Sequence, residues 1–214
     1  MTKSSDICSY MCNADEYLTI ASSSTGSYKE KGSKFIAFAY PVNNTVQVND
    51  ILSRLRTKYH DAHHCCYAYV LGLKRDKYRV NDDGEPVNTA GKPILSQINA
   101  RKLTNVCVVV IRYFGGILLG KGGLARAYMQ AADHALRNAP IIKKLQKEMY
   151  RVCFDLKDMN DVMKIIGNSS LEVISQKFEQ IPEINIGIRT KDVPAIIKKF
   201  TMINGVEIKN LGIM

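Results

Sequence analysis

The sequence predicts an α+β protein of two domains, and three features of the 214-residue chain support this prediction. The last third contains a repeated segment that begins in each copy with a Lys-Asp pair. Upstream, a buried strand at residues 106–111 leads into a glycine-rich stretch and then a long helix. A charged segment, Lys143 to Lys147, separates the two regions. We therefore expect one domain at residues 1–142 and a second at residues 146–214.

The repeat predicts the fold of the second domain. In its two copies, residues 157–164 and 191–198, apolar side chains recur at the helical spacing i, i+3, i+4 and i+7. Asp158 and Asp192 stand where each helix would begin, and either side chain can cap the first turn. Strand-like runs precede and follow both helices, so the order is βαββαβ, which is the ferredoxin-like arrangement.

The first domain is expected to be an α/β sandwich of alternating strands and helices. A helix with an apolar stripe from Val48 to Tyr59 follows Thr45 or Asn49 as its cap. Pro93 begins a short helix, and Pro140 ends a long one. The elements expected in chain order are a strand at 34–42, the capped helix, a strand at 65–71, the short helix, a strand at 106–111, and a helix from 124 to about 139.

Composition narrows the class of protein. Hydrophobic residues make up 46% of the chain and charged residues 23%, which is the range of globular proteins. The longest apolar run is far shorter than the roughly 20 residues that cross a bilayer, and the first residues lack the layout of a signal peptide. We expect a cytoplasmic protein without membrane contact. The six cysteines contain no CxxC motif and are expected to be free thiols.

The charge balance favours negatively charged partners. Lys and Arg number 30 against 20 Asp and Glu, which gives a net charge of +10. Such an excess attracts polyanions through steering and counterion release. It is a bias only, because many basic proteins have no nucleic-acid function.

A glycine-rich arc, Arg112 to Arg126, is the first candidate site. Glycines let the backbone approach a ligand, and the following helix offers free N–H groups and the positive end of its dipole. Cationic side chains add donors for an anion. The alternative is that the glycines merely permit a tight turn and close packing. The candidate anion-binding residues are Arg112, Tyr113, Gly115, Gly116, Gly120, Lys121, Gly122, Gly123 and Arg126, with Arg126 expected to face solvent.

An acidic loop, Asp82 to Pro86, is the second candidate. Asp82, Asp83 and Glu85 place three carboxylates on one turn, which is either simple turn chemistry or a possible set of oxygen ligands for Mg²⁺. If this loop lies beside the arc, basic and acidic walls would form one groove in which phosphoryl chemistry is conceivable. The histidines and cysteines at 60–66 do not predict zinc, because strand alternation divides them between two faces. We expect no resident metal or cofactor.

Six motifs follow one another along the chain: Asp82-Asp83-Gly84-Glu85-Pro86, Thr89-Ala90-Gly91-Lys92-Pro93-Ile94, Arg112-Tyr113-Phe114-Gly115-Gly116, Leu119-Gly120, Gly122-Gly123-Leu124 and Arg126-Ala127-Tyr128. Read together, they resemble the IMPACT/YigZ family, and the resemblance extends over nearly the whole chain. The resemblance implies a first domain similar to a ribosomal-protein domain and a second similar to the last domain of elongation factor G. It also implies a role in translational regulation, as for eukaryotic IMPACT. Two positions depart from the family pattern: Val87-Asn88 replaces small residues, and Lys121 replaces a neutral one.

Three functions remain open at this point. The first is a non-catalytic protein that binds RNA, the ribosome or a ribosome-associated protein through the arc, without reading a DNA sequence. The second is a Mg²⁺-dependent enzyme that acts on a phosphorylated small molecule or nucleotide. The third is a regulator whose groove receives an acidic segment of a protein partner. Salt dependence of binding separates the first from the second.

Overall fold

The computed structural model describes residues 15–179 and 181–213, and these form two compact units. One unit comprises Tyr17–Lys144; the other joins residues 15–16 to the segment that starts at Leu145. Whether the two fold independently stays a prediction. The expectations for Cys8, Cys12 and the N-terminal layout lie outside the described residues. No helix in the described ranges is long and apolar enough to cross a membrane.

The first unit contains a five-stranded antiparallel sheet with the strand order β2-β3-β6-β4-β5. A separate two-stranded sheet pairs β1 with β7. In chain order the elements are β1 (Glu16–Ile20), β2 (Ser24–Glu30), β3 (Ser33–Pro41), α1 (Thr45–Lys58), β4 (His64–Leu71), β5 (Lys77–Asn81), α2 (Gly91–Ala100), β6 (Val106–Tyr113), α3 (Gly120–Arg137) and β7 (Ile141–Leu145).

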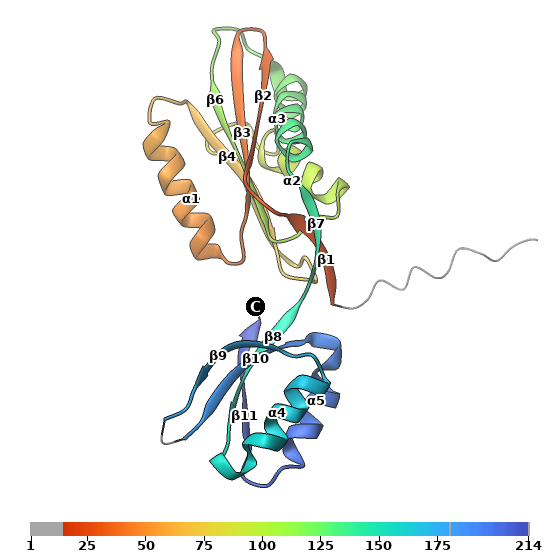
Figure 1. The fold of residues 1–214 in the computed structure, drawn as a ribbon. Coiled ribbons are helices and arrows are strands. Elements are labelled where there is room, and N and C mark those ends of the chain that lie inside the picture. The colour runs from red at the N-terminus through yellow and green to blue at the C-terminus, as the bar shows by residue number, and fades with distance from the viewer. Residues whose placement is uncertain (1–14, 180, 214) are drawn as a thin grey trace, which may run out of the picture. The chain divides into compact units, whose positions relative to one another are not determined.

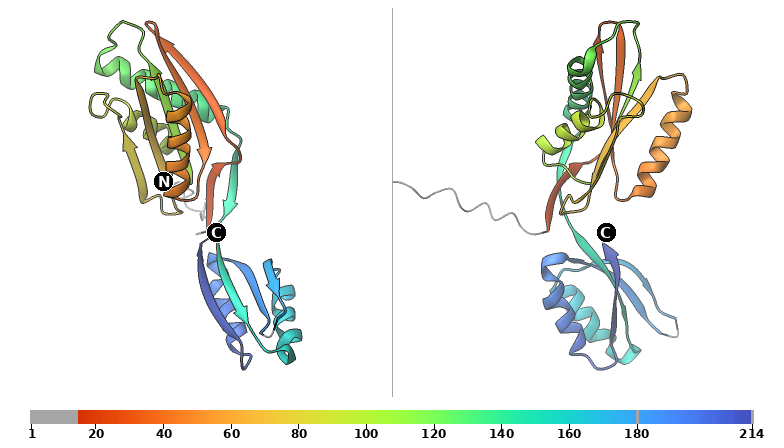
Figure 2. Two further views of the ribbon diagram at one scale, coloured as in Figure 1. Left: turned by 90° about the vertical axis from the view of Figure 1, so that its left-hand side faces the viewer. Right: turned by 180° about the vertical axis from the view of Figure 1, so that it is seen from behind.

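Helices cover both faces of this sheet. Figures 1 and 2 show α1 on one side, with α2 and α3 on the other. Successive residues of the central strand β6 point to opposite faces, so Val108 packs into the α2/α3 core while Val109 packs into the α1 core. Both side chains are fully buried, which explains the continuous apolar run at 106–111. Cys65 and Cys66 divide between the two cores in the same way.

Several boundaries differ from those expected. Helix α3 begins at Gly120 instead of Leu124, so three glycines of the arc lie within its first turn. Helix α1 is capped by Asn44, whose side chain accepts a hydrogen bond from the N–H of Gln47, and the caps proposed at Thr45 and Asn49 were wrong. The presumed connector at residues 143–147 lies in β7 and β8. Strand β1 was missed, and so were β2 and β5, whose exposed positions are mostly polar, which weakens the apolar alternation.

The second unit has the βαββαβ order that the repeat predicted. Its antiparallel sheet has the strand order β11-β8-β10-β9, and α4 and α5 pack on it through buried side chains such as Val162 and Phe200. Asp158 and Asp192 occupy the N-cap positions, but neither side chain makes the capping hydrogen bond, because a short 3₁₀ turn precedes each helix. The elements are β8 (Lys147–Cys153), α4 (Met159–Asn168), β9 (Glu172–Lys177), β10 (Glu183–Arg189), α5 (Val193–Thr201) and β11 (Glu207–Ile213).

Candidate functional site

The first carboxylate of the acidic loop holds the start of α2. Asp82 accepts hydrogen bonds from the backbone N–H groups of Asn88 at 2.9 Å, Ala90 at 3.0 Å and Gly91 at 2.8 Å. Ala90 is the N-cap of α2 and offers no side-chain acceptor, so Asp82 takes over the capping of this helix. Asn88 has φ 66°, a left-handed conformation that Asn tolerates, and this keeps the turn intact despite the unusual Val87-Asn88 pair.

The second carboxylate ties the loop to the neighbouring strand. One Asp83 oxygen accepts from the backbone N–H of Cys65 at 2.7 Å, and the other pairs with Arg56 of α1 at 2.8 Å. The Asp83 carbonyl oxygen lies 2.8 Å from Nδ1 of His64. Arg56 was not identified from the sequence, because its partner is 27 positions away along the chain.

Glu85 is the centre of a buried polar network. Its side chain is only 2% exposed, and Oε1 accepts hydrogen bonds from Nη1 of Arg112 at 2.6 Å and from the Tyr128 hydroxyl at 2.7 Å. Burial, followed by the neighbouring Cys66 and Glu85, raises the pKa of Tyr128, so this hydroxyl stays protonated and donates. Burial likewise raises the pKa of the Cys66 thiol, which packs 3.3 Å from the same hydroxyl.

Arg112 is held in place by aromatic rings as well as by Glu85. Its guanidinium carbon lies 5.5 Å from the ring centre of Phe35 and 5.6 Å from that of Phe114. The residue is 5% exposed, so its charge is neutralised inside the protein by Glu85. The acidic loop and the arc therefore meet directly through an ion pair, and Arg112 does not stand on the surface as a free cation.

Glycine is required at different positions of the arc for different structural reasons. A side chain at Gly115 would collide with the backbone of Gly32, and Gly116 and Gly120 have positive φ angles of 87° and 68°. Added bulk at Gly123 would press on Leu119. At Gly122 neither cause applies, because φ is not positive and an added Cβ would meet nothing within 4 Å.

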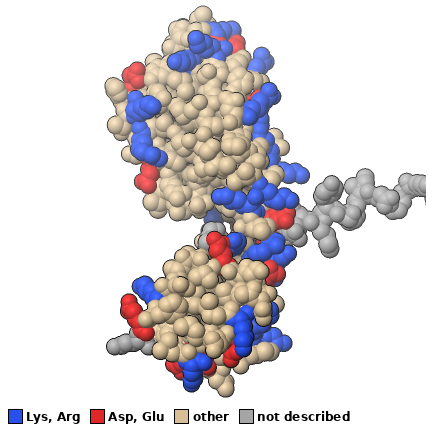
Figure 3. Space-filling model, viewed as in Figure 1, with Lys and Arg blue, Asp and Glu red and all other residues tan. Residues whose placement is uncertain are grey.

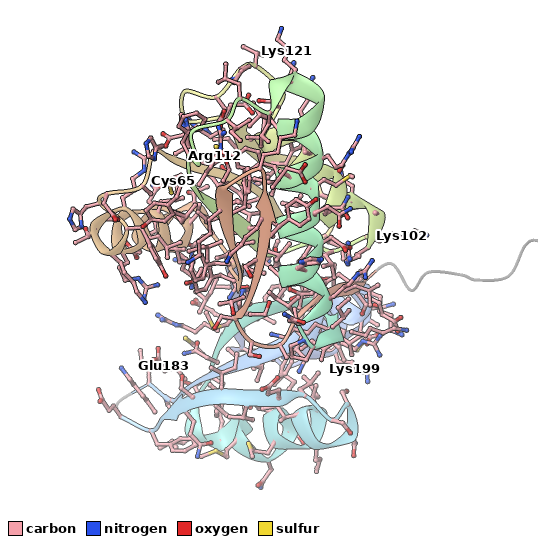
Figure 4. All side chains as sticks on the ribbon, turned by 90° about the horizontal axis from the view of Figure 1, so that it is seen from above. Cys65, Lys102, Arg112, Lys121, Glu183 and Lys199 are labelled. Atoms are coloured by element: carbon pink, nitrogen blue, oxygen red, sulfur yellow. The ribbon has the colours of Figure 1, made fainter. Side chains whose placement is uncertain are left out.

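The start of α3 is basic and open. Its N-cap, Leu119, has no side-chain capping bond, and the first turn contains no acidic residue. Figure 4 shows Lys121 projecting outward from this end of the helix, while Arg112 lies among the side chains of the sheet. Arg126 is exposed, as expected, and makes no hydrogen bond or ion pair with any described residue. This end of α3 therefore presents uncompensated positive charge.

Two hollows adjoin the start of α3, and they divide the arc between them. The first, the helix groove, has a volume of about 480 Å³ and lies between the first turns of α2 and α3, with Lys92 and Arg126 on its walls. The second, the pair pocket, also has about 480 Å³ and contains Glu85 and Arg112. Its remaining lining residues are His63, His64, Pro86, Phe114, Leu118, Leu119, Gly120, Lys121 and Leu124.

The structure does not bring every candidate residue to these hollows. The Tyr113 hydroxyl donates to Asp61 at 2.8 Å, and the residue packs at the edge of the α1 core, away from both hollows. Lys92 was missed as a site residue, although it stands in the family motif Gly91-Lys92-Pro93. A further hollow, of about 560 Å³, is lined by Tyr40, Arg54 and other residues, none of them among the candidates.

Most carboxylate oxygens of the acidic loop already accept hydrogen bonds from the protein. Asp82 and Asp83 use both oxygens as acceptors, and Glu85 uses one. Within the described ranges, no group of three His, Cys, Asp or Glu residues is arranged to hold a metal ion. A cation at this loop would have to displace hydrogen bonds that support α2 and β4.

Fold and site together define a two-unit α/β protein in which an acidic loop is locked onto a glycine-rich arc. The family model of the Impact N-terminal domain matches residues 31–136. An IMPACT family member of Haemophilus influenzae is 31% identical over 188 residues, covering 87% of this chain and 91% of its own length. The chain belongs to the IMPACT family.

Two further relatives extend the comparison. IMPACT family member YigZ of Escherichia coli is 29% identical over 160 residues, which cover 74% of this chain and 78% of that protein. A solved crystal structure of a hypothetical protein has a TM-score of 0.70 and 27% identity, covering 94% of this chain and 98% of the other. The similarity thus extends beyond the N-terminal domain.

Proposed function

We propose that this protein is a cytoplasmic, translation-associated binding protein that engages the phosphates of RNA at the start of α3. The observation that carries the proposal is Gly122. Within a helix, glycine is less favourable than alanine by up to about 1 kcal/mol, yet neither the backbone conformation nor the packing requires glycine at position 122. Close approach of a ligand to the backbone N–H groups supplies a reason.

Charge supports the same assignment. Lys92 and Arg126 line the helix groove and Lys121 lines the neighbouring pair pocket, and none of the three forms an ion pair with a described residue. Lys121 in the first turn opposes the helix dipole, so it is unfavourable until an anion binds beside it. On the face visible in Figure 3, the Lys and Arg side chains gather along the edges of this unit and leave its middle largely uncharged.

The link to translation comes from the family resemblance and is part of the proposal. So are the suggested likenesses of the two units to a ribosomal-protein domain and to the last domain of elongation factor G, because shared folds are a weak warrant for function. With no base-reading motif in the sequence, contacts to phosphate should dominate, and binding should weaken steeply as salt rises.

Replacing Gly122 by Ala tests the proposal. Helix propensity predicts that Gly122→Ala raises the free energy of unfolding by about 0.5–1 kcal/mol. If the backbone contacts phosphate, the same change should weaken binding of single-stranded RNA, measured by fluorescence anisotropy. Gly167→Ala in α4 is the matched control: Gly167 is also helical and open, so it should gain stability and keep its affinity. Stabilisation of both variants with unchanged RNA affinity would refute the site.

Arg126→Ala gives a second test at the same groove. Arg126 contacts no described acidic partner, so its loss should leave the melting temperature nearly unchanged. The free energy of RNA binding should become less favourable by about 1.5–3 kcal/mol if a charged hydrogen bond to phosphate is lost. The slope of log affinity against log salt should shrink by about one. A fall in stability without a change in affinity would make Arg126 a structural residue.

A further inference from the structure

The pair pocket contains hydrogen-bonding groups that the protein leaves unused. Arg112 donates through Nη1 to Oε1 of Glu85, whereas its Nε and Nη2 make no hydrogen bond with any described residue. Nε and Nη2 share one edge of the guanidinium, the edge that forks onto two acceptors. Arg112 and Glu85 are buried and both line the pocket. An unpaired donor of Arg112 is therefore unfavourable unless a ligand or water accepts its hydrogen bond.

Glu85 supplies the complementary acceptor. Its Oε1 receives Arg112 and Tyr128, with His64 Nε2 at 3.8 Å, and its Oε2 has no partner among the described residues. The pair thus keeps donors of Arg112 and one acceptor of Glu85 that no described residue uses. A phosphate or carboxylate would satisfy the donors but would be repelled by Glu85. The pair therefore selects a neutral group with two acceptors next to one donor.

The rest of the pocket offers apolar wall to a group of small-molecule size. Phe114, Leu118 and Leu124 contribute apolar wall, and the volume of about 480 Å³ lies within the range of small-molecule sites. Lys121 and Gly120, at the start of α3, stand on the lining as well. A group bound here would therefore lie next to the proposed phosphate site, as the base of a bound nucleotide does.

We propose that the pair pocket binds one unpaired guanine. Guanine presents N7 and O6 as adjacent acceptors, and an arginine fork onto these two atoms is the commonest specific contact in nucleic-acid recognition. Its N1–H lies on the other side of O6, on the Watson–Crick edge, and is the donor that would reach Oε2 of Glu85. Adenine places an amino donor where O6 stands, so it would leave the fork unsatisfied. The inference rests on the proposed RNA-binding function for the strand that delivers the base.

The experiment compares strands and free nucleotides. Anisotropy is measured with a labelled oligouridine strand, the same strand with one central guanine, and the same strand with one central adenine. Guanine should raise affinity on the order of tenfold and adenine should not, because one bidentate contact discriminates by about that factor. Inosine keeps N7, O6 and N1–H, so it should match guanine. Guanosine monophosphate, followed by NMR, shows whether the free nucleotide suffices or a strand is required.

Two variants and one control test whether the gain in affinity from guanine arises in the pair pocket. Glu85→Gln should remove most of the guanine advantage, and circular dichroism reports whether the fold survives. Phe114→Ala shortens a pocket wall, whereas Ile117→Ala changes an exposed apolar residue of the same loop outside the pocket. The first should lower guanine-dependent affinity at least about fivefold and the second should not.

The outcomes separate the two proposals. Salt-dependent binding of oligouridine with no gain from guanine overturns the guanine pocket and leaves the phosphate site standing. Binding of free guanosine monophosphate without any affinity for oligouridine overturns the proposed RNA function and retains the pocket. Equal gains from guanine and adenine, or equal effects of the two loop variants, also overturn the pocket.

Discussion

The helices α2 and α3 begin at the two sides of one groove, yet their first turns are satisfied in opposite ways. At α2, a carboxylate from the acidic loop accepts the N–H groups of Ala90 and Gly91. At α3, no described side chain caps the helix, and a lysine stands in the first turn. The first turn of α2 is completed by a side chain of the protein, whereas the first turn of α3 has no such acceptor among the described residues.

This difference divides the two candidate motifs by role. The acidic loop is chiefly structural, because Asp82, Asp83 and Glu85 hold α2, β4 and Arg112 in place. The arc contains the residues that structure alone does not account for, Gly122 and Lys121. Local departures from stability rules are typical of functional sites, so the start of α3 is where function is expected.

Removing the cap of α2 should have the largest effect. Asp82→Ala leaves three backbone N–H groups without their acceptor and should lower the free energy of unfolding by about 2–4 kcal/mol, measured by chemical denaturation. Asp76→Ala is the control, since Asp76 is an exposed aspartate of the same unit, and it should change stability by no more than about 0.5 kcal/mol. A loss below about 1 kcal/mol for Asp82→Ala would show that α2 does not depend on this cap.

A smaller effect is expected at the other ends of the same helices. Asp133 of α3 accepts from Arg101, the C-cap of α2, at 2.5 Å, and from Arg137 at 2.9 Å. Burial alone would raise the pKa of Asp133, but Arg101 and then Arg137 outweigh it and hold the pKa below its usual value. Asp133→Asn should therefore cost about 1.5 kcal/mol near neutral pH, without a change in RNA affinity.

The lowered pKa of Asp133 also fixes the sign of the pH dependence. The carboxylate stabilises the fold above the usual aspartate pKa of about 3.9, and this contribution is lost as the pH falls through the lower folded-state pKa. Unfolding free energies of the parent protein and Asp133→Asn should thus converge below about pH 4. A gap that stays constant down to acid pH would mean that the charge is not what links the two helices.

The sequence predicted the features that depend on periodicity and missed those that depend on distant pairing. The helix stripes and the βαββαβ order follow from apolar spacing, which is local. Contact between the acidic loop and the arc could be considered from the sequence but not predicted. Glu85 and Arg112 are 27 positions apart, and nothing in the local sequence specifies their contact. The same holds for Asp133 of α3, which is buried and pairs with Arg101, 32 positions away.

The smallest expected effect gives the most direct test of the comparison between the two helix starts. Lys121→Glu replaces a cation by an anion in the uncapped first turn of α3. Because an anion interacts favourably with the positive end of the helix dipole, this change should raise the free energy of unfolding by about 0.3–1 kcal/mol. Lys92→Glu makes the same exchange in the first turn of α2, where Asp82 already supplies a negative charge. Repulsion between the two carboxylates should cancel the gain there. Both changes should weaken RNA binding, because Lys92 lines the helix groove and Lys121 stands in the first turn of the helix beside it.

Stability and affinity must therefore move in opposite directions at α3, while only affinity falls at α2. Thermal or chemical unfolding and RNA anisotropy on the two charge variants give all four numbers. Equal stability changes would show that the two helix starts are electrostatically alike and that Asp82 does not compensate the dipole of α2. A stability gain at Lys121→Glu with undiminished RNA affinity would show that the open end of α3 is a local imperfection of the fold, and the anion would have to bind elsewhere.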